Sequence, residues 1–371
     1  MDFVLIYTFL INRKKNNLSI IFIRLKLLLY IEDRDMTEEK AIKIHELTLS
    51  VRPLSGTDVF DVMSSLRKDV DKLKEFLESY EIQEGIELNW YENNASIRIT
   101  DISPPLNPDE LSTYDISEPK VVTLRTEDDI FFNTILIVDI SKSMNGRDLE
   151  VNNVKSAVEK IKSVFSFENL NPFLEQFKEG NNVTRKAGAI FAGLLYLSEK
   201  TRLAKGEIIS IITFADKAEA LNLEAKEYVV TDTKSHKILN RMAKIMLEEV
   251  DEKIGMATNM ANAIEKCARI VNALPKNRRK QPLMVILLTD GFDTSQKVKE
   301  AVVNLFAENE NIVLHAVGLG PYVNKKELLE ISRYCGGELF MPDNLGELLE
   351  WYDKRAKDLT IRLSEMQQGF R

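Results

Sequence analysis

The sequence predicts an α/β fold, with a doubly wound, mostly parallel sheet flanked by helices and preceded by a small α+β module. Two observations predict the sheet. Nearly continuous apolar runs rich in Ile, Val and Leu alternate with longer stretches of helical periodicity, as expected for strands buried on both faces of a parallel sheet. Polar residues follow two of these runs, at the sheet edge where open α/β sheets bind ligands.

Composition is that of a globular chain, with 44% hydrophobic and 29% charged residues among 371. The net charge of −8 argues against general nucleic-acid binding, which needs clustered cations to neutralise phosphates. The two cysteines, Cys267 and Cys335, form no CxxC motif, so neither a cysteine-based zinc site nor a disulfide framework is predicted. A reducing, cytoplasmic compartment fits this cysteine usage.

Residues 1–35 carry two apolar runs that are interrupted by basic residues. Neither run reaches the ~20 residues that a membrane-spanning helix needs, and the second contains Arg24 and Lys26. No small-residue cleavage site follows a single apolar core, so a signal peptide is not predicted. We expect an over-extended start of translation, with a peripheral membrane anchor as the alternative. Membrane association is otherwise not expected.

Residues 36–102 have the pattern of the small α+β module. Residues 41–51 alternate like a half-buried strand, residues 58–80 carry apolar side chains at helical spacing, and residues 86–100 fit two strands joined by a turn. The segment 103–127 contains Pro and Ser and is predicted to be a linker or wrapping loop.

The larger α/β domain is predicted over residues 128–366. Helical periodicity separates its strands, and a polar-edged stretch at 218–230 fits an antiparallel edge strand. The predicted buried strands are residues 132–140, 207–214, 283–290 and 311–318.

Short oxygen-bearing side chains mark the carboxyl ends of two strands. Asp139, Ser141 and Ser143 alternate after the first strand, so an extended chain would point them the same way. Asp290 ends the third strand, and Thr258 lies in a polar loop that opens the helix before it. The carboxyl ends of parallel strands share one edge, so these three loops are expected to converge.

Each loop also has a purely structural interpretation. The residues after Asp139 could satisfy free N–H groups ahead of a helix starting near Asp148, and Thr258 or Asn259 could cap another helix. Asp290-Gly291 is a common turn dipeptide. Their joint occurrence at one sheet edge favours a binding site.

The three loops together resemble the metal-ion-dependent adhesion site of a von Willebrand factor A domain. That motif is DxSxS, then a Thr in a loop, then an Asp after a later strand. Here DISKS begins at Asp139, GMATN carries Thr258, and TDG carries Asp290. The resemblance covers about residues 128–366 and all five motif positions are filled.

The resemblance implies a Mg²⁺ or Mn²⁺ site. Ser141, Ser143 and Thr258 would be ligands through their hydroxyls, whereas Asp139 and Asp290 would act through water or hold the ligands in place. In the family, an Asp or Glu of a partner protein typically completes the coordination. The implied function is metal-dependent protein binding, with no catalytic residue and no enzymatic activity.

An insertion is predicted near residues 149–183, because the chain between Asp139 and the next strand is longer than one crossover helix requires. Similar insertions occur in bacterial and archaeal A-domain proteins that accompany MoxR-type AAA+ ATPases. This resemblance implies a subunit or adaptor of an intracellular complex, with such an ATPase or its substrate as partner.

Two other functions are compatible with the same residues. A Mg²⁺-dependent hydrolase or phosphotransferase would need a general base near the ion, and Asp293 is the candidate. A haloacid dehalogenase type phosphatase is not predicted, because Ser141 stands where its second carboxylate is needed. The other alternative is a structural scaffold whose polar loops bind no metal.

Overall fold

The computed structural model describes residues 40–106, 112–116, 119, 121–126, 130–221, 223 and 226–364. The segment 1–35, with its predicted start or anchor, lies outside the described residues. The chain divides into two compact units. In the smaller unit, β1 (Lys40–Lys43) pairs with β5 (Ser112–Asp115). No helix in the described part of the chain is long and apolar enough to cross a lipid bilayer.

The larger unit contains a five-stranded sheet whose strands come from distant parts of the chain. Its order is β16-β6-β2-β4-β3. Residues 121–125 form β6, where the sequence predicts a linker. Strand β16, which follows the α/β domain in sequence, pairs with β6. Alternate apolar residues of both strands are buried, which gives the sheet its core face. The strands are β2 (Glu46–Pro53), β3 (Glu87–Trp90), β4 (Ala95–Ser103), β6 (Val121–Arg125) and β16 (Ile361–Ser364).

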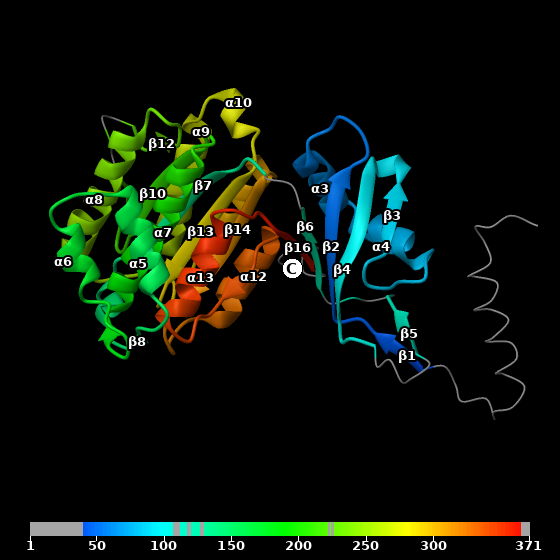
Figure 1. Cartoon of the computed structure of the whole chain (residues 1–371), viewed down its shortest axis with the longest axis horizontal. Helices are drawn as coiled ribbons and strands as arrows, with labels where there is room; N and C mark the ends of the chain where they lie inside the picture. The colour runs from blue at the N-terminus through cyan, green and yellow to red at the C-terminus, as the bar shows by residue number, and fades with distance from the viewer. Residues whose placement is uncertain are drawn as a thin grey trace, which may run out of the picture. The chain divides into compact units, whose positions relative to one another are not determined.

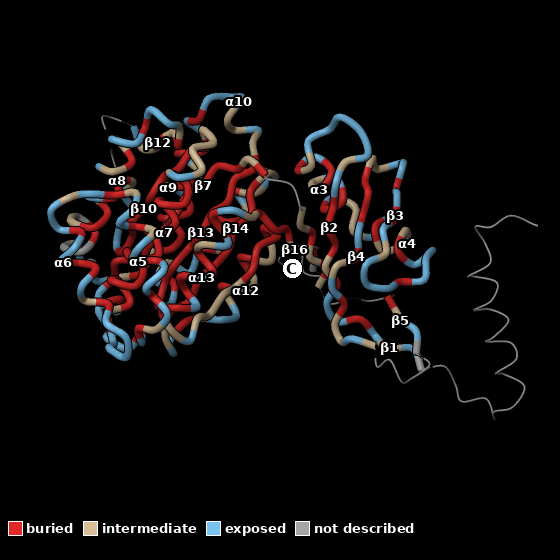
Figure 2. The backbone as a smooth tube through the Cα atoms, in the orientation of Figure 1, coloured by how far each residue is buried: buried red, intermediate tan, exposed pale blue. Residues whose placement is uncertain are grey.

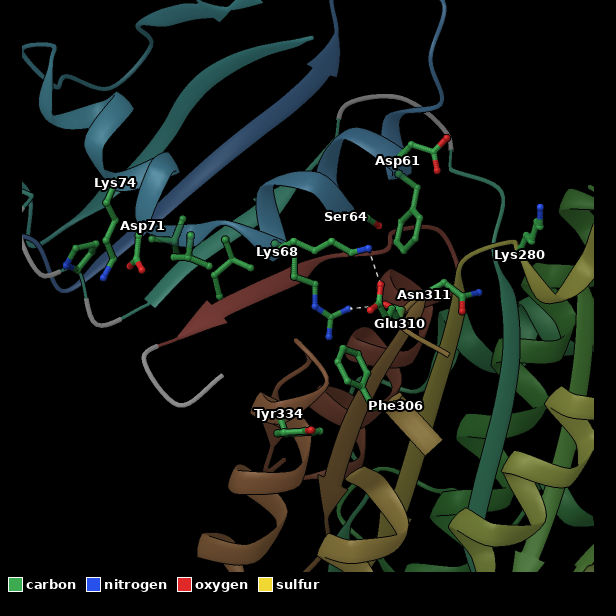
Figure 3. A pocket seen from close by; sticks show the side chains of 16 residues that line it. Asp61, Ser64, Lys68, Asp71, Lys74, Lys280, Phe306, Glu310, Asn311 and Tyr334 are labelled. Atoms are coloured by element: carbon green, nitrogen blue, oxygen red, sulfur yellow. Dashed lines mark hydrogen bonds and ion pairs between the residues drawn. The ribbon is translucent and has the colours of Figure 1, made fainter. Parts of the chain in front are cut away.

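Two helices, α3 (Val59–Lys68) and α4 (Val70–Glu78), replace the single helix predicted over 58–80. Asp69 breaks the helix, because its backbone is not helical (φ −132°, ψ 66°) and its carboxylate caps α4 by accepting from the N–H of Lys72. Near the end of α3, buried Arg67 donates to the carbonyl of Ile312 over 3.1 Å and lies 4.5 Å from the centre of the Phe306 ring. Figure 3 shows this contact region, in which Lys68 also pairs with Glu310.

The second sheet of the larger unit has the order β11-β10-β7-β13-β14-β15, and β12 also pairs with β10 (Figure 1). Strands β10, β7, β13, β14 and β15 run parallel to one another, whereas β11 and β12 run antiparallel to β10. Every residue of β7, β10, β13 and β14 is buried (Figure 2), which confirms the predicted α/β fold class. The strands are β7 (Asn133–Asp139), β10 (Ile208–Phe214), β11 (Ala218–Ala220), β12 (Val229–Val230), β13 (Leu283–Thr289), β14 (Ile312–Gly318) and β15 (Leu339–Phe340).

Helices cover both faces of this sheet (Figure 1). On one face, α9 (Met260–Ala273), α11 (Val298–Glu308) and α12 (Lys325–Tyr334) share a core with alternate strand residues such as Ile135 and Val285. On the other face, Tyr196 of the central helix α7 bonds Thr134 through their hydroxyls over 2.7 Å. Helix α7 (Arg185–Leu203) packs against three further helices, α5 (Lys155–Val164), α8 (His236–Glu252) and α13 (Leu345–Arg355). The short helix α10 (Lys276–Arg279) precedes β13 in sequence.

The region of the predicted insertion contains two short strands around two helices. Strand β8 (Leu149–Glu150) pairs antiparallel with β9 (Asn182–Val183), and α5 and α6 (Leu170–Leu174) lie between them in sequence. The chain thus leaves the Asp139 loop and returns to the start of α7. This return places the N-terminus of α7 next to that loop.

Candidate functional site

The first candidate residue, Asp139, is fully buried at the end of β7. Its Oδ1 accepts from the N–H of Ser141 over 2.7 Å, and its Oδ2 accepts from the hydroxyl of Thr289 over 2.6 Å. Burial raises the pKa of Asp139 to about 6, although both hydrogen bonds act in the opposite direction. Asp139 therefore links the ends of β7 and β13 and holds the turn that follows β7.

The two serines after Asp139 lie together and face the end of β13. Ser141 Oγ and Ser143 Oγ are 3.0 Å apart, and the Ser143 hydroxyl donates to Asp290 Oδ1 over 2.7 Å. Neither hydroxyl caps the helix that was considered from sequence, because a 3-10 turn, η2 (Lys142–Asn145), follows without a side-chain cap and α5 begins only at Lys155. The structure thus brings Ser141, Ser143 and Asp290 into one hydrogen-bonded group.

The loop that carries Thr258 is attached to the same edge. An isolated parallel bridge joins Gly255 to Ser141, with the N–H of Lys142 donating to the Gly255 carbonyl over 2.9 Å. Asn259, rather than Thr258, caps α9 by accepting from the N–H of Asn262. The Thr258 hydroxyl is therefore not used to cap α9.

Thr258 itself lies against the loop after β13. Its side chain is nearly buried, and its hydroxyl would be 3.2 Å from a Cβ placed on Gly291. The Thr258 carbonyl accepts from the N–H of Thr294 over 2.8 Å. All five sequence-predicted residues thus lie on three loops that contact one another at the carboxyl edge of the sheet.

Sequence reasoning missed Arg185, the first residue of α7. This buried guanidinium donates from Nη1 to Asp290 Oδ2 over 2.8 Å and from Nε to Asp148 Oδ1 over 2.8 Å, and Nη2 contacts Asp148 Oδ2. The hydrogen bond with Asp148 raises the pKa of Arg185 above its ordinary value and lowers that of Asp148. Asp290 therefore faces the serine hydroxyls with one oxygen and a permanent cation with the other.

A sequence signal for Arg185 does exist. Cations are unfavourable in the first turn of a helix, where the helix dipole is positive, yet α7 begins with Arg185 and Lys186 and has no acidic residue in its first turn. A cation in that position indicates a compensating carboxylate nearby. Its identity could not be read from sequence, because Asp290 is 105 positions away.

Two glycines make room for the guanidinium. A Cβ on Gly320 would lie 2.5 Å from Arg185 Cζ, and one on Gly146 would lie 3.2 Å from the same atom. Gly320 also has a φ of +81°, which side-chain-bearing residues rarely adopt. The backbone N–H of Arg185 donates to the Gly146 carbonyl over 3.0 Å.

Asp293, the candidate general base, has both oxygens occupied as acceptors. Its Oδ1 accepts from the N–H of Met260 over 2.9 Å. Its Oδ2 accepts from the Ser295 hydroxyl over 2.6 Å and from the N–H groups of Lys297 and Val298, each over 3.3 Å. Asp293 therefore connects the starts of α9 and α11 and has the environment of a structural carboxylate.

The donor set is suited to a small, hard cation. Mg²⁺ takes oxygen ligands at about 2.1 Å in octahedral geometry, so neighbouring ligands lie about 3.0 Å apart. The Ser141 and Ser143 hydroxyl oxygens have that separation of 3.0 Å. Within the described residues, no group of three or more His, Cys, Asp or Glu side chains could hold a metal ion, so an ion here would rely on hydroxyl ligands.

A family model described as von Willebrand factor type A domain matches residues 134–292. No curated protein sequence matches the chain.

The solved structures to which the chain is similar share little sequence with it. A von Willebrand factor type A protein from Catenulispora acidiphila is 16% identical with a TM-score of 0.42, covering 64% of this chain and 44% of its own. BatB from Bacteroides thetaiotaomicron is 15% identical with a TM-score of 0.39, covering 64% of this chain and 100% of its own. VWA2, the ArnB paralog from Sulfolobus acidocaldarius, is 17% identical with a TM-score of 0.34, covering 65% and 49%.

The chain thus spans less than half the length of the Catenulispora and Sulfolobus proteins. The family match begins inside β7 and ends just after Asp290, so it includes all three loops of the candidate site. Residues 134–292 of this chain match the von Willebrand factor type A domain family.

Proposed function

We propose that this domain is a metal-dependent protein-binding module, in which Mg²⁺ or Mn²⁺ at the carboxyl edge of the sheet binds a carboxylate of a partner protein. Ser141, Ser143 and Thr258 would hold the ion through their hydroxyls, and Asp139 and Asp290 would orient these groups. The bound ion would supply an electrophilic position for the partner's Asp or Glu. The family to which residues 134–292 are matched often mediates protein–protein interaction.

One observation carries the proposal, namely the 3.0 Å separation of the two serine hydroxyls beside buried Asp139 and Asp290. Three carboxylates and one guanidinium meet around this point, from Asp139, Asp148, Asp290 and Arg185. Among these four groups the carboxylates outnumber the guanidinium. A divalent ion would offset this excess of carboxylates, and neutral hydroxyl ligands would leave the ion attractive to a further carboxylate.

The hydrogen bonds that Asp293 accepts favour binding over hydrolysis. A general base must be able to take a proton from water or substrate. Asp293 accepts from three backbone N–H groups and one hydroxyl, so these bonds occupy the carboxylate that a hydrolase mechanism would use.

We further propose that the partner belongs to a cytoplasmic complex, with a MoxR-type AAA+ ATPase or its substrate as the candidate.

A metal-free scaffold is the second candidate, and Arg185 is the observation that favours it. Its guanidinium already neutralises one oxygen of Asp290 without any metal. In that case the Ser141–Ser143–Asp290 hydrogen bonds would be the final arrangement of the edge, and Mg²⁺ would not change it.

Isothermal titration of Mg²⁺ and Mn²⁺ into chelator-treated protein separates these functions. We expect saturable binding in the wild type and a loss of affinity of about tenfold or more in Ser141→Ala, since a ligand is removed. Ser163→Ala is the matched control, because Ser163 is exposed and its hydroxyl only bonds the Lys160 carbonyl. Absence of saturable binding in the wild type would support the metal-free scaffold instead.

A further inference from the structure

Large hydrophobic side chains gather on the loops around the candidate site. In the described part of the chain, seven such side chains are exposed, and four of them lie on three loops at the carboxyl edge of the sheet. These four are Ile254 (58% exposed), Met256 (75%), Phe292 (57%) and Tyr322 (73%). Exposed apolar side chains on loops that border a polar centre are typical of protein interaction sites.

Each loop contacts the site through its backbone or a neighbouring residue. Gly255, between Ile254 and Met256, bridges to Ser141, and Phe292 follows Gly291, which lies against the Thr258 side chain. Tyr322 is two positions from Gly320, which lies against Arg185 and hence beside Asp290.

The exposure of these side chains does not come from loosely held loops. The N–H of Met256 donates to Asp216 Oδ2 over 2.8 Å, and Asp293 anchors the chain directly after Phe292. Val323, directly after Tyr322, is buried, and the N–H of Leu319 donates to the Thr289 carbonyl over 2.9 Å. Hydrogen bonds and packing therefore hold the backbone beside Met256, Phe292 and Tyr322, which lowers the entropy cost of binding a partner.

Charge at the same edge is compatible with an acidic partner. Lys142 lies between Ser141 and Ser143 and is exposed, as is Arg147 on the same loop. Met and aromatic side chains are enriched at interface centres, where they bury large areas at low entropy cost.

We propose that Ile254, Met256, Phe292 and Tyr322 form an apolar collar around the carboxylate-binding position. The collar accepts a partner segment in which one Asp or Glu is flanked by large aliphatic or aromatic side chains. This inference rests on the proposed function, because the ion would bind the carboxylate while the collar buries the flanking residues. A carboxylate among polar neighbours would leave the collar in water and would bind more weakly.

The test is a selection of phage-displayed nine-residue peptides with a fixed central Asp and random flanking positions. Full-length protein is the target, in Mg²⁺ and separately in EDTA. We expect the Mg²⁺ selection to enrich large apolar residues beside the Asp. Synthetic versions of the enriched peptides should lose about tenfold or more in affinity for Met256→Ser/Phe292→Ser, and should lose binding when their Asp is changed to Asn.

Tyr91→Ser is the matched control, because Tyr91 is 79% exposed but belongs to the five-stranded-sheet region. Mg²⁺ titration of the same variants should give the wild-type affinity, since no collar side chain is a proposed ligand. Equal weakening by Tyr91→Ser, or no preference for apolar flanks, would overturn the collar while leaving the metal site standing. Apolar peptides selected equally in EDTA, with binding that depends on Met256 and Phe292, would support the collar and contradict the metal-dependent function.

Discussion

Arg185 Nη1 donates to Asp290 Oδ2 over 2.8 Å, and the two side chains are 7% and 0% exposed. The pair joins the first turn of α7 to the end of β13. Asp290 is also the residue that accepts from the Ser143 hydroxyl, so Arg185 controls how its carboxylate is oriented toward the candidate metal site.

Replacing Arg185 by Ala should destabilise the domain by about 3–5 kcal/mol, because it leaves the buried Asp290 charge unpaired. Urea unfolding in a chelator measures the loss. If Mg²⁺ binds beside Asp290, adding it should restore part of the lost stability, and by more than it stabilises the wild type. Arg147→Ala, at an exposed position of the neighbouring loop, should change stability by less than about 0.5 kcal/mol. A loss in Arg185→Ala no larger than in this control would contradict the buried pair.

Gly320→Ala should disturb the same pair from the opposite side. The added Cβ would lie 2.5 Å from Arg185 Cζ in a backbone with φ +81°, so we expect a loss of about 2–4 kcal/mol from combined strain and displacement. Gly206→Ala provides the comparison, because Gly206 has a φ of +78° but nothing within 4 Å of its would-be Cβ. It should show the backbone strain alone, measured by thermal unfolding of both variants. Similar losses in the two variants would indicate that the Arg185 contact contributes nothing.

Asp293→Ala should behave as the loss of a structural carboxylate. Two helix starts lose an acceptor, and we expect about 2–3 kcal/mol of destabilisation, with Asp293→Asn less affected. Far-ultraviolet circular dichroism during urea unfolding measures this. Asp61→Ala, at an exposed carboxylate in the first turn of α3, is the control. A stable Asp293→Ala variant that lost phosphoester turnover would instead point to the hydrolase.

Acid should weaken the fold through Glu338. Burial alone would raise the pKa of this carboxyl, but Arg355, His315 and Arg362 outweigh burial and lower the pKa from 4.5 to about 2. The folded state then binds fewer protons than the unfolded state between these values. The stabilisation is therefore fully present above about pH 5 and is lost as the pH falls towards 2, by about 3 kcal/mol in total.

Unfolding free energies measured from pH 7 down to pH 2 test this expectation. Glu338→Gln should be less stable at pH 7 and should show a shallower decline. Glu350→Gln removes an exposed carboxylate of α13 and should keep the wild-type slope. A wild-type slope in Glu338→Gln would show that other carboxylates control the acid response.

The sequence by itself determined the four central strands, to within one or two residues at each end. Strands such as β7 and β13 are buried on both faces, so selection for apolar side chains acts on every position and leaves an unbroken run that is visible without a structure. The same logic placed Asp139 and Asp290 at one edge, since parallel strands end on the same side. Their roles as metal-orienting groups stay a prediction.

Local backbone geometry limited the prediction of the smaller elements. The single helix predicted over 58–80 is two helices, because Asp69 adopts a non-helical conformation that its apolar neighbours do not reveal. The strand β6 lies in the predicted linker, since five residues, of which two are buried, give only a short alternating signal.

Only the tertiary structure decided which distant residues meet. Arg185 pairs with Asp290, β16 pairs with β6, and Asp293 bonds the start of α9. A hydrogen bond depends on where two residues lie in space. When the two are far apart in sequence, no periodic pattern of residues predicts that they will meet. The residue types and their spacing determined where a site could form, whereas the packing of α7 against the sheet edge decided which charges face it.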